Sequence, residues 1–145
     1  MRKVFYNSIL AKILLCLSSC ETITLGLFVF TTRASLSQTT LRHELTHSLQ
    51  YCEWFIASSI LVLLSGCFFV YPWWMALLPI VAYYIVYILE WIVRLVYCLP
   101  ANSWNVAKAS KAAYRLNSFE AEAYMSEMIA DYNVSRDLFN NYKYL

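Results

Sequence analysis

The sequence predicts a mainly α-helical membrane protein whose core is a hairpin of two transmembrane helices. Three observations lead to this prediction: the composition, two long apolar segments, and the positions of the basic residues around them. Of the 145 residues, 61% are hydrophobic and only 14% are charged. Soluble domains carry about 25% charged residues. The composition therefore indicates an integral membrane protein in contact with the lipid bilayer.

Two segments are apolar enough to cross a bilayer. Residues 54–71 contain no charged side chain, and their length of about eighteen residues is near the minimum for a membrane span. Residues 73–98 are interrupted only by Glu90 and Arg94, which are spaced for mutual pairing on a helix. The connecting sequence YPWW is aromatic and uncharged, as is typical of a turn at the level of the lipid headgroups.

The basic residues predict the orientation of this hairpin. Lysines and arginines precede the first segment and follow the second, and none lies in the connecting turn. By the positive-inside rule, both termini should be cytoplasmic, in what we expect to be a bacterial inner membrane. Residue 43 should then lie on the same side as the residues after 99. The net charge of +2 and the scattered basic residues give no indication of a nucleic-acid partner.

We expect a single domain, residues 1–145, with four segments in order. These are an N-terminal strand or re-entrant segment (1–34), a helix that continues into the first span (35–71), the second span (73–98), and cytoplasmic helices (99–145). The S-x-x-Q sequence that begins at Ser35 has the form of a capping box for the second segment. Asn117 and Ser118 predict the start of a helix within the fourth.

The N-terminal segment allows two interpretations. Residues 21–32 are rich in β-branched and aromatic side chains, which favours a strand that pairs with residues 4–19 in a small β-hairpin or re-entrant element. The alternative joins residues 9–30 into a third transmembrane helix containing Glu21. A single carboxylate is costly inside a bilayer, so we favour the strand.

The sequence HELTH, residues 43–47, carries the clearest chemistry. On a helix, His43 and His47 lie four residues apart on one face and can bind one metal ion, for which Zn²⁺ is the expected identity. Glu44 follows the first histidine and is placed to act as a general base toward a water on that metal. These are the only two histidines in the chain. A third protein ligand must therefore be a carboxylate or a thiolate.

Glu120 is the expected third ligand. It opens an E-x-x-A pattern in a predicted helix and lies on the same predicted side of the membrane as His43. Glu122 is the alternative, but it lies about 200° around the helix from Glu120, so the two cannot both face one metal ion.

Five further residues are candidates for supporting roles. Gln50, Glu90 and Glu122 could form hydrogen bonds to the ligands, whereas Tyr114 and Tyr124 could stabilise an oxyanion. Gln50 continues the helix face of the two histidines. Pairing with Arg94 is the simpler role for Glu90, and the spacing does not select between the two tyrosines.

Four motifs in order, ITLGLFVF, LRHELTHSLQ, YILEW and AYRLNSFEAEAY, resemble those of small bacterial integral-membrane proteins of the zincin-like type. The resemblance covers most of the chain. It implies a metallopeptidase-like site with His43, His47 and Glu120 as zinc ligands and Glu44 as the base. It also implies a strand beside the metal-binding helix, to which a substrate peptide could add.

The function that we expect is that of a membrane-embedded zinc metallopeptidase, which hydrolyses membrane-proximal polypeptides with a water activated by Glu44. The alternative is a non-catalytic small subunit or assembly factor whose partner is a larger membrane complex. A third interpretation is a zinc hydrolase that acts on a lipid or another non-peptide amide.

Overall fold

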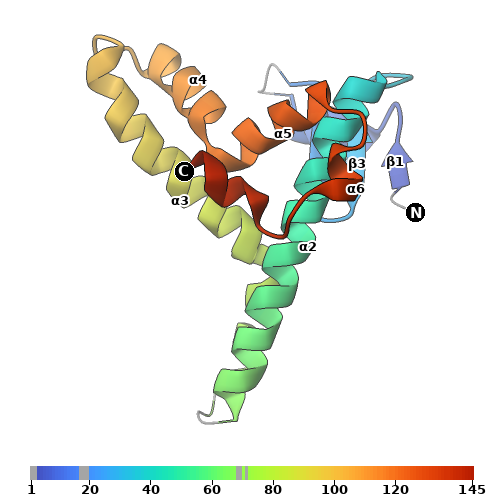
Figure 1. Ribbon diagram of the computed structural model, residues 1–145, viewed down its shortest axis with the longest axis vertical. Coiled ribbons are helices and arrows are strands. Elements are labelled where there is room, and N and C mark those ends of the chain that lie inside the picture. Colours follow the sequence, from blue (N-terminus) through green and yellow to red (C-terminus); the bar gives the residue numbers. More distant parts are fainter. Residues whose placement is uncertain (1–2, 17–19, 68–69, 71) are drawn as a thin grey trace. The chain divides into compact units, whose positions relative to one another are not determined.

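The computed structural model describes residues 3–16, 20–67, 70 and 72–145. The protein is mainly helical, with one small three-stranded sheet (Figure 1). The chain forms two compact units. Unit 1 contains residues 1–52 and 123–137, and unit 2 contains residues 53–122 and 138–145.

The sheet of unit 1 is built from three short strands. They are β1 (Lys3–Phe5), β2 (Thr22–Leu25) and β3 (Phe28–Thr31), in the spatial order β1-β3-β2. Strand β3 pairs antiparallel with β2 and parallel with β1. A short helix, α1 (Ile9–Leu14), precedes β2 in the chain. The expected β-structure is therefore present, and the alternative third transmembrane helix over residues 9–30 is wrong.

The strand expected over residues 21–32 is itself a hairpin. The chain reverses at Gly26, whose φ of +60° is a conformation that side-chain-bearing residues rarely adopt. A Cβ atom at this position would also lie 3.3 Å from Cε1 of Tyr51. Both the tight turn and the close aromatic neighbour therefore require glycine here.

Helix α2 (Gln38–Gly66) contains the HELTH sequence and most of the first expected span. Its N-terminus differs from the predicted capping box at Ser35. The hydroxyl of Ser37 accepts a hydrogen bond from the backbone N–H of Thr40 at 3.1 Å, so Ser37 is the capping residue. Residues 68, 69 and 71, at the end of the expected span, lie outside the described residues.

The second apolar segment begins with a 3₁₀ turn, η1 (Trp73–Leu77), and continues as α3 (Leu78–Ala101). Helix α3 ends one residue after Pro100, a residue type that disfavours the continuation of a helix. Helices over Gln38–Gly66 and Trp73–Ala101 are long and apolar enough to cross a membrane, and only 11% and 17% of their most apolar windows are buried in the protein. The core helix of a soluble protein would be mostly buried.

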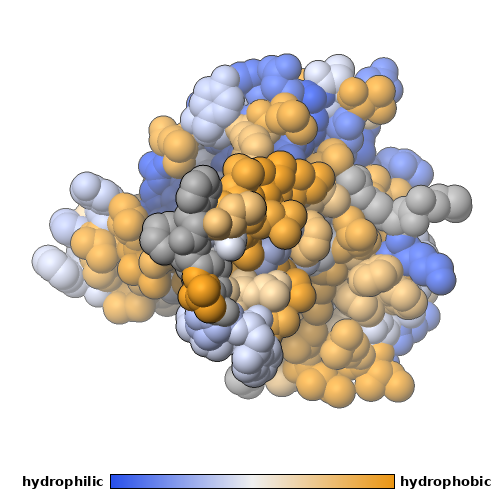
Figure 2. All heavy atoms as spheres, turned by 90° about the horizontal axis from the view of Figure 1, so that it is seen from below, coloured by the Kyte–Doolittle hydropathy of each residue, from blue (hydrophilic) through white to orange (hydrophobic). Residues whose placement is uncertain are grey.

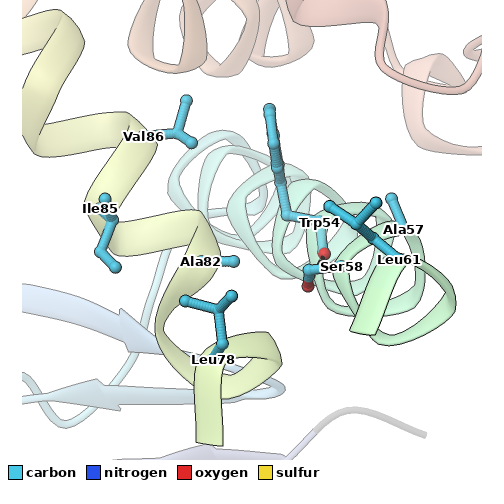
Figure 3. Close-up of a pocket in the computed structure, with 8 residues that line it drawn as sticks. All are labelled: Trp54, Ala57, Ser58, Leu61, Leu78, Ala82, Ile85 and Val86. Carbon is cyan, nitrogen blue, oxygen red and sulfur yellow. Dashed lines mark hydrogen bonds between the residues drawn. The ribbon is translucent and has the colours of Figure 1, made fainter. Parts of the chain in front are cut away.

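The apolar parts of these helices in unit 2 enclose a pocket of about 300 Å³ (Figure 3). Trp54, Ala57, Ser58 and Leu61 of α2 line one side, and Leu78, Ala82, Ile85 and Val86 of α3 line the other. Viewed from the end where α2 terminates, hydrophobic residues occupy much of the visible surface (Figure 2). Exposed apolar helices of this kind are suited to a lipid environment.

The C-terminal part contains helices α4 (Val106–Leu116), α5 (Ser118–Met128) and α6 (Tyr132–Ser135), followed by a 3₁₀ turn, η2 (Asn140–Tyr144). In unit 2, α4 packs on α3 through a core formed by Cys98, Ala109 and Ala113. Helix α5 begins where Asn117 and Ser118 predicted a helix start, and it ends at Met128.

Candidate metal centre

The two histidines of HELTH lie close together on α2. His43 and His47 are each 8% exposed, and their Nε2 atoms are 3.2 Å apart. Two ligand atoms of a tetrahedral zinc ion, at bond lengths near 2.05 Å, are about 3.3 Å apart. The separation of the two imidazole nitrogens therefore matches that of ligands on one metal ion.

The hydrogen bonds at the far side of each ring orient these nitrogens. Nδ1 of His43 lies 2.9 Å from Oε1 of Glu127, and Nδ1 of His47 lies 2.9 Å from Oε1 of Gln50. Because a carboxylate and an amide oxygen accept hydrogen bonds, the tautomer that satisfies both contacts carries its proton on Nδ1. The two Nε2 atoms then direct lone pairs toward one another, which is repulsive unless a proton or a metal cation lies between them.

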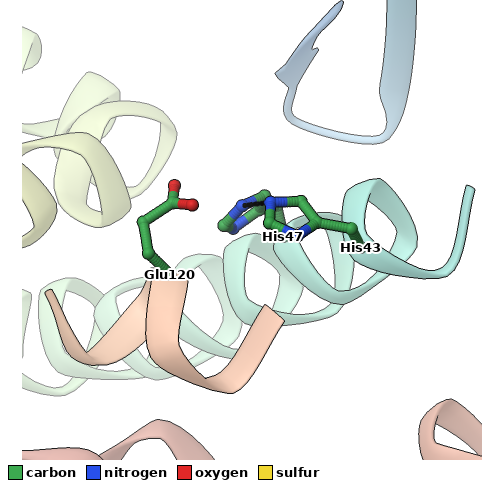
Figure 4. A group of neighbouring side chains, drawn as sticks. All are labelled: His43, His47 and Glu120. Carbon is green, nitrogen blue, oxygen red and sulfur yellow. Dashed lines mark hydrogen bonds between the residues drawn. The ribbon is translucent and has the colours of Figure 1, made fainter. Parts of the chain in front are cut away.

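Glu120 supplies the oxygen donor. His43, His47 and Glu120 form a buried group whose ligand atoms all lie within 4.8 Å of one another, and their side chains point toward one another (Figure 4). Glu120 is 3% exposed, and its Oε1 accepts a hydrogen bond of 2.8 Å from the hydroxyl of Tyr87. Two imidazole nitrogens and one carboxylate oxygen are a donor set that could hold a metal ion and that catalytic zinc sites use.

Glu44, the expected base, is held by the sheet of unit 1. The hydroxyl of Thr24 in β2 donates a hydrogen bond of 2.5 Å to Oε2 of Glu44. The carboxylate is 8% exposed. Through Thr24, strand β2 thus fixes the rotamer of Glu44, the residue that follows His43. The sequence pattern did not indicate this role for Thr24.

Glu127 is a further residue that the sequence analysis missed. Besides its bond to the ring of His43, its backbone carbonyl accepts a hydrogen bond of 2.8 Å from Nη2 of Arg42. Helical spacing in the sequence could nevertheless have indicated Glu127. Glu120, Tyr124 and Glu127 have the i, i+4, i+7 spacing of one helix face, and α5 is continuous over all three.

Two of the candidates for supporting roles contact the histidines. Gln50 is fully buried and contacts His47, as expected. The ring of Tyr124 lies edge-to-face with that of His43, with centroids 4.9 Å apart. Tyr114 lies on α4. Glu122 is buried on α5 and does not belong to the group of His43, His47 and Glu120.

Glu90 makes the ion pair that its spacing predicted and, in addition, caps a helix. Its Oε1 pairs with Arg94 at 3.3 Å, the interaction that the spacing predicted. The same carboxylate accepts hydrogen bonds from the backbone N–H and the hydroxyl of Ser118, at 2.8 and 2.6 Å. Glu90 therefore caps the first residue of α5, the helix that carries Glu120.

No protein-family model, curated protein or solved structure matches this chain. The resemblance to zincin-like membrane proteins therefore stays a prediction from the motifs. The chain is mainly helical, and two of its helices could span a membrane. It also contains a buried group of two histidines and one glutamate that could hold a metal ion.

Proposed function

We propose that this protein is a membrane-embedded zinc metallopeptidase that hydrolyses membrane-proximal polypeptides. The observation that carries the proposal is the buried group of His43, His47 and Glu120, with Glu44 next to the first ligand. Two nitrogens and one oxygen leave a fourth tetrahedral position for water or substrate, as in catalytic zinc sites. Structural zinc sites, by contrast, use four protein ligands.

The residues of the chain have distinct parts in this reaction. A bound zinc ion supplies Lewis acidity, which polarises a peptide carbonyl and acidifies a coordinated water. Glu44 accepts the proton of the attacking water and then passes it to the leaving amine. Thr24 keeps one oxygen of Glu44 occupied, so that the other is the proton acceptor. Glu127 and Gln50 hold the Nδ1 protons of the ligands, which keeps both Nε2 atoms available to the metal.

The two apolar helices favour a substrate close to the bilayer. Helix α2 carries the histidines in its N-terminal part and continues without interruption into its apolar C-terminal part. His47 precedes Trp54 by seven residues, about 10 Å along the helix axis. A polypeptide that emerges from the membrane would meet the metal ligands within that distance.

Metal analysis of the protein purified in detergent tests the ligand set. We expect close to one zinc ion per wild-type chain, and little zinc in the His43→Ala/His47→Ala variant. Glu120→Gln should also lose zinc. The matched control is Glu122→Gln, which changes a buried glutamate on the same helix and should retain zinc. The ligand set is wrong if the control loses zinc and Glu120→Gln keeps it.

A second experiment separates catalysis from metal binding. Wild-type protein and the Glu44→Gln variant are incubated in nanodiscs with a library of membrane-anchored peptides, and products are identified by mass spectrometry. We expect cleavage by the wild type, and zinc without cleavage in Glu44→Gln. A zinc-containing wild type that cleaves no peptide would instead favour a non-catalytic subunit, and cleavage of lipids alone would favour a lipid hydrolase.

A further inference from the structure

The sheet of unit 1 has two faces of opposite character. Alternate residues of a strand point to opposite faces, and residues in register share a face. The inner face carries Thr24, which bonds to Glu44, together with Val29 and Thr31, which are completely buried. This inner face is made of small and β-branched side chains. The large apolar side chains of the sheet therefore lie on the other side.

The outer face carries the aromatic residues. The register places Phe5, Phe30 and Ile23 in one cross-strand row, and Lys3, Phe28 and Leu25 in the next. The rings of Phe5 and Phe30 are stacked with centroids 5.0 Å apart. Phe5 is 40% exposed and Phe28 is 45% exposed.

Helix α1, like the sheet, buries a small side chain and exposes large apolar ones. Its completely buried residue is the small Ala11, whereas Ile9 and Ile13 are 73% and 63% exposed. The start of the helix is attached to the sheet, because the backbone N–H of Ser8, its capping residue, bonds to the carbonyl of Thr31 in β3 at 2.9 Å. A short helix on a water-exposed sheet would have its large apolar residues turned inward.

We call the exposed apolar part of this region the N-terminal apolar surface. It consists of Phe5, Ile9, Leu10, Ile13, Leu14 and Phe28. Leaving such side chains in water costs roughly 25 cal/mol for each Å² of apolar surface, so a concentration of them marks a contact site. This surface lies within unit 1, and none of its residues belongs to the two long apolar helices.

The charges around this surface identify its partner. Lys3 lies in the same cross-strand row as Phe28, and Lys12 is exposed on α1. Among the described residues of the N-terminal segment, the acidic Glu21 is paired with Arg33. Large apolar side chains interspersed with lysines are the pattern that binds the interface of an anionic membrane leaflet, where lysine ammonium groups reach the headgroups.

We propose that the N-terminal apolar surface inserts into the headgroup–acyl boundary of an anionic lipid leaflet. The chain then contacts the bilayer through the sheet and α1 as well as through its two long helices. This contact does not depend on the bound metal or on peptidase activity. Its consequence is that strand β2, which holds Glu44, is kept at the membrane surface.

Photocrosslinking in the full-length chain tests this proposal. The photoreactive residue p-benzoylphenylalanine replaces Phe28 or Ile13, and the protein is reconstituted into nanodiscs that contain phosphatidylglycerol. The control position is Thr39, an exposed polar residue of unit 1 at the start of α2. After irradiation, we expect lipid adducts at positions 28 and 13 in several-fold higher yield than at 39. Circular dichroism verifies that each variant is folded.

Three results would overturn the proposal. Crosslinks that join two copies of the chain at position 28 would show that a second copy covers this surface, and a lipid yield no higher than that at Thr39 would show that lipid does not. Lys12→Gln tests the charge. This substitution should lower the adduct yield at position 13 in phosphatidylglycerol discs but not in phosphatidylcholine discs. If it changes the yield equally in the two lipids, an anionic leaflet is excluded.

Discussion

At the residue scale, the contacts around the two histidines decide what the site can do. Each imidazole is fixed by a partner on its Nδ1 side, and Glu44 is fixed by Thr24. In the proposed function, the candidate metal ligands and the candidate base would therefore need little rearrangement when a substrate binds. Such preorganisation is what allows a catalytic group to act without a large entropic cost.

Thr24→Val removes the hydroxyl that holds Glu44 and keeps the shape of the side chain. We expect zinc content to be unchanged and kcat to fall about tenfold, with a smaller change in KM, because the loss corresponds to about 1.4 kcal/mol of transition-state stabilisation. Thr22→Val is the matched control on the same strand, since Thr22 bonds to Thr31 and not to Glu44. An equal loss of kcat in the control would mean that Thr24 acts only through the stability of the sheet.

Glu127→Ala removes the acceptor for the Nδ1 proton of His43. We expect zinc affinity, measured by competition with a fluorescent chelator, to fall about 10- to 100-fold, as is usual when a hydrogen-bond partner of a metal ligand is lost. Glu127→Gln should restore part of the affinity because an amide oxygen still accepts the proton. Met125→Ala, an exposed substitution on the same helix, serves as the control. Unchanged affinity in Glu127→Ala would contradict the role assigned to it.

At the element scale, one capping interaction determines where α5 begins. Glu90 of α3 bonds to the backbone and side chain of Ser118, while Arg94 of the same helix pairs with Glu90. Hydrogen bonds to a charged group contribute about 1.5–3 kcal/mol. The start of α5, and with it the position of Glu120 two residues later, thus depends on a carboxylate that belongs to a predicted membrane span.

Glu90→Gln should lower both the thermal midpoint and the zinc affinity, because the N-terminus of α5 loses a charged acceptor and Arg94 loses its partner. Asn105→Ala provides the comparison. It removes the side-chain cap of α4, which accepts from Lys108, and should cost about 1 kcal/mol of stability with no change in zinc affinity. If Glu90→Gln lowers the midpoint but not the affinity, its contribution is to stability alone.

Periodicity and cap residues predicted most of the helices, but not the sheet. The apolar runs before and after residue 72 predicted α2 and α3, and Asn117 and Ser118 predicted the start of α5. Residues 22–31 carried the composition of a strand, yet the turn at Gly26 divides them into two. Local composition predicts β-structure without register, because pairing depends on partners elsewhere in the chain. Strand β1 is such a partner.

At the scale of the whole molecule, bound metal should stabilise the fold. The candidate ligands come from α2 and α5, which are far apart in sequence, so a zinc ion held by them would bind the native state far better than the unfolded chain. Such a ligand stabilises by about 4 kcal/mol at a free concentration of 1,000 times its Kd. We expect EDTA to lower the thermal midpoint of the wild type and added zinc to restore it. A shift of equal size in His43→Ala/His47→Ala would assign the effect to another site.

The orientation of the chain is also testable at this scale. Because the basic residues flank both long apolar segments, we predict that the two termini lie on the cytoplasmic side. A reporter that is active only outside the cytoplasm should be inactive when fused to either end, and active when inserted after residue 72. Opposite results for the two termini would mean that one of the two helices does not cross the membrane.

The sequence by itself predicted the two long apolar helices and the pair of histidines with Glu44, and it favoured Glu120 over Glu122 as the third member of that group. These follow from local rules, since helical periodicity fixes which residues share a face and length fixes what can cross a bilayer. Only the tertiary structure showed that Thr24 holds Glu44, that Glu127 holds His43, that Glu90 caps α5, and that the sheet turns its phenylalanines outward. Each of these joins residues separated by at least twenty positions or depends on strand register, and no local pattern encodes such contacts.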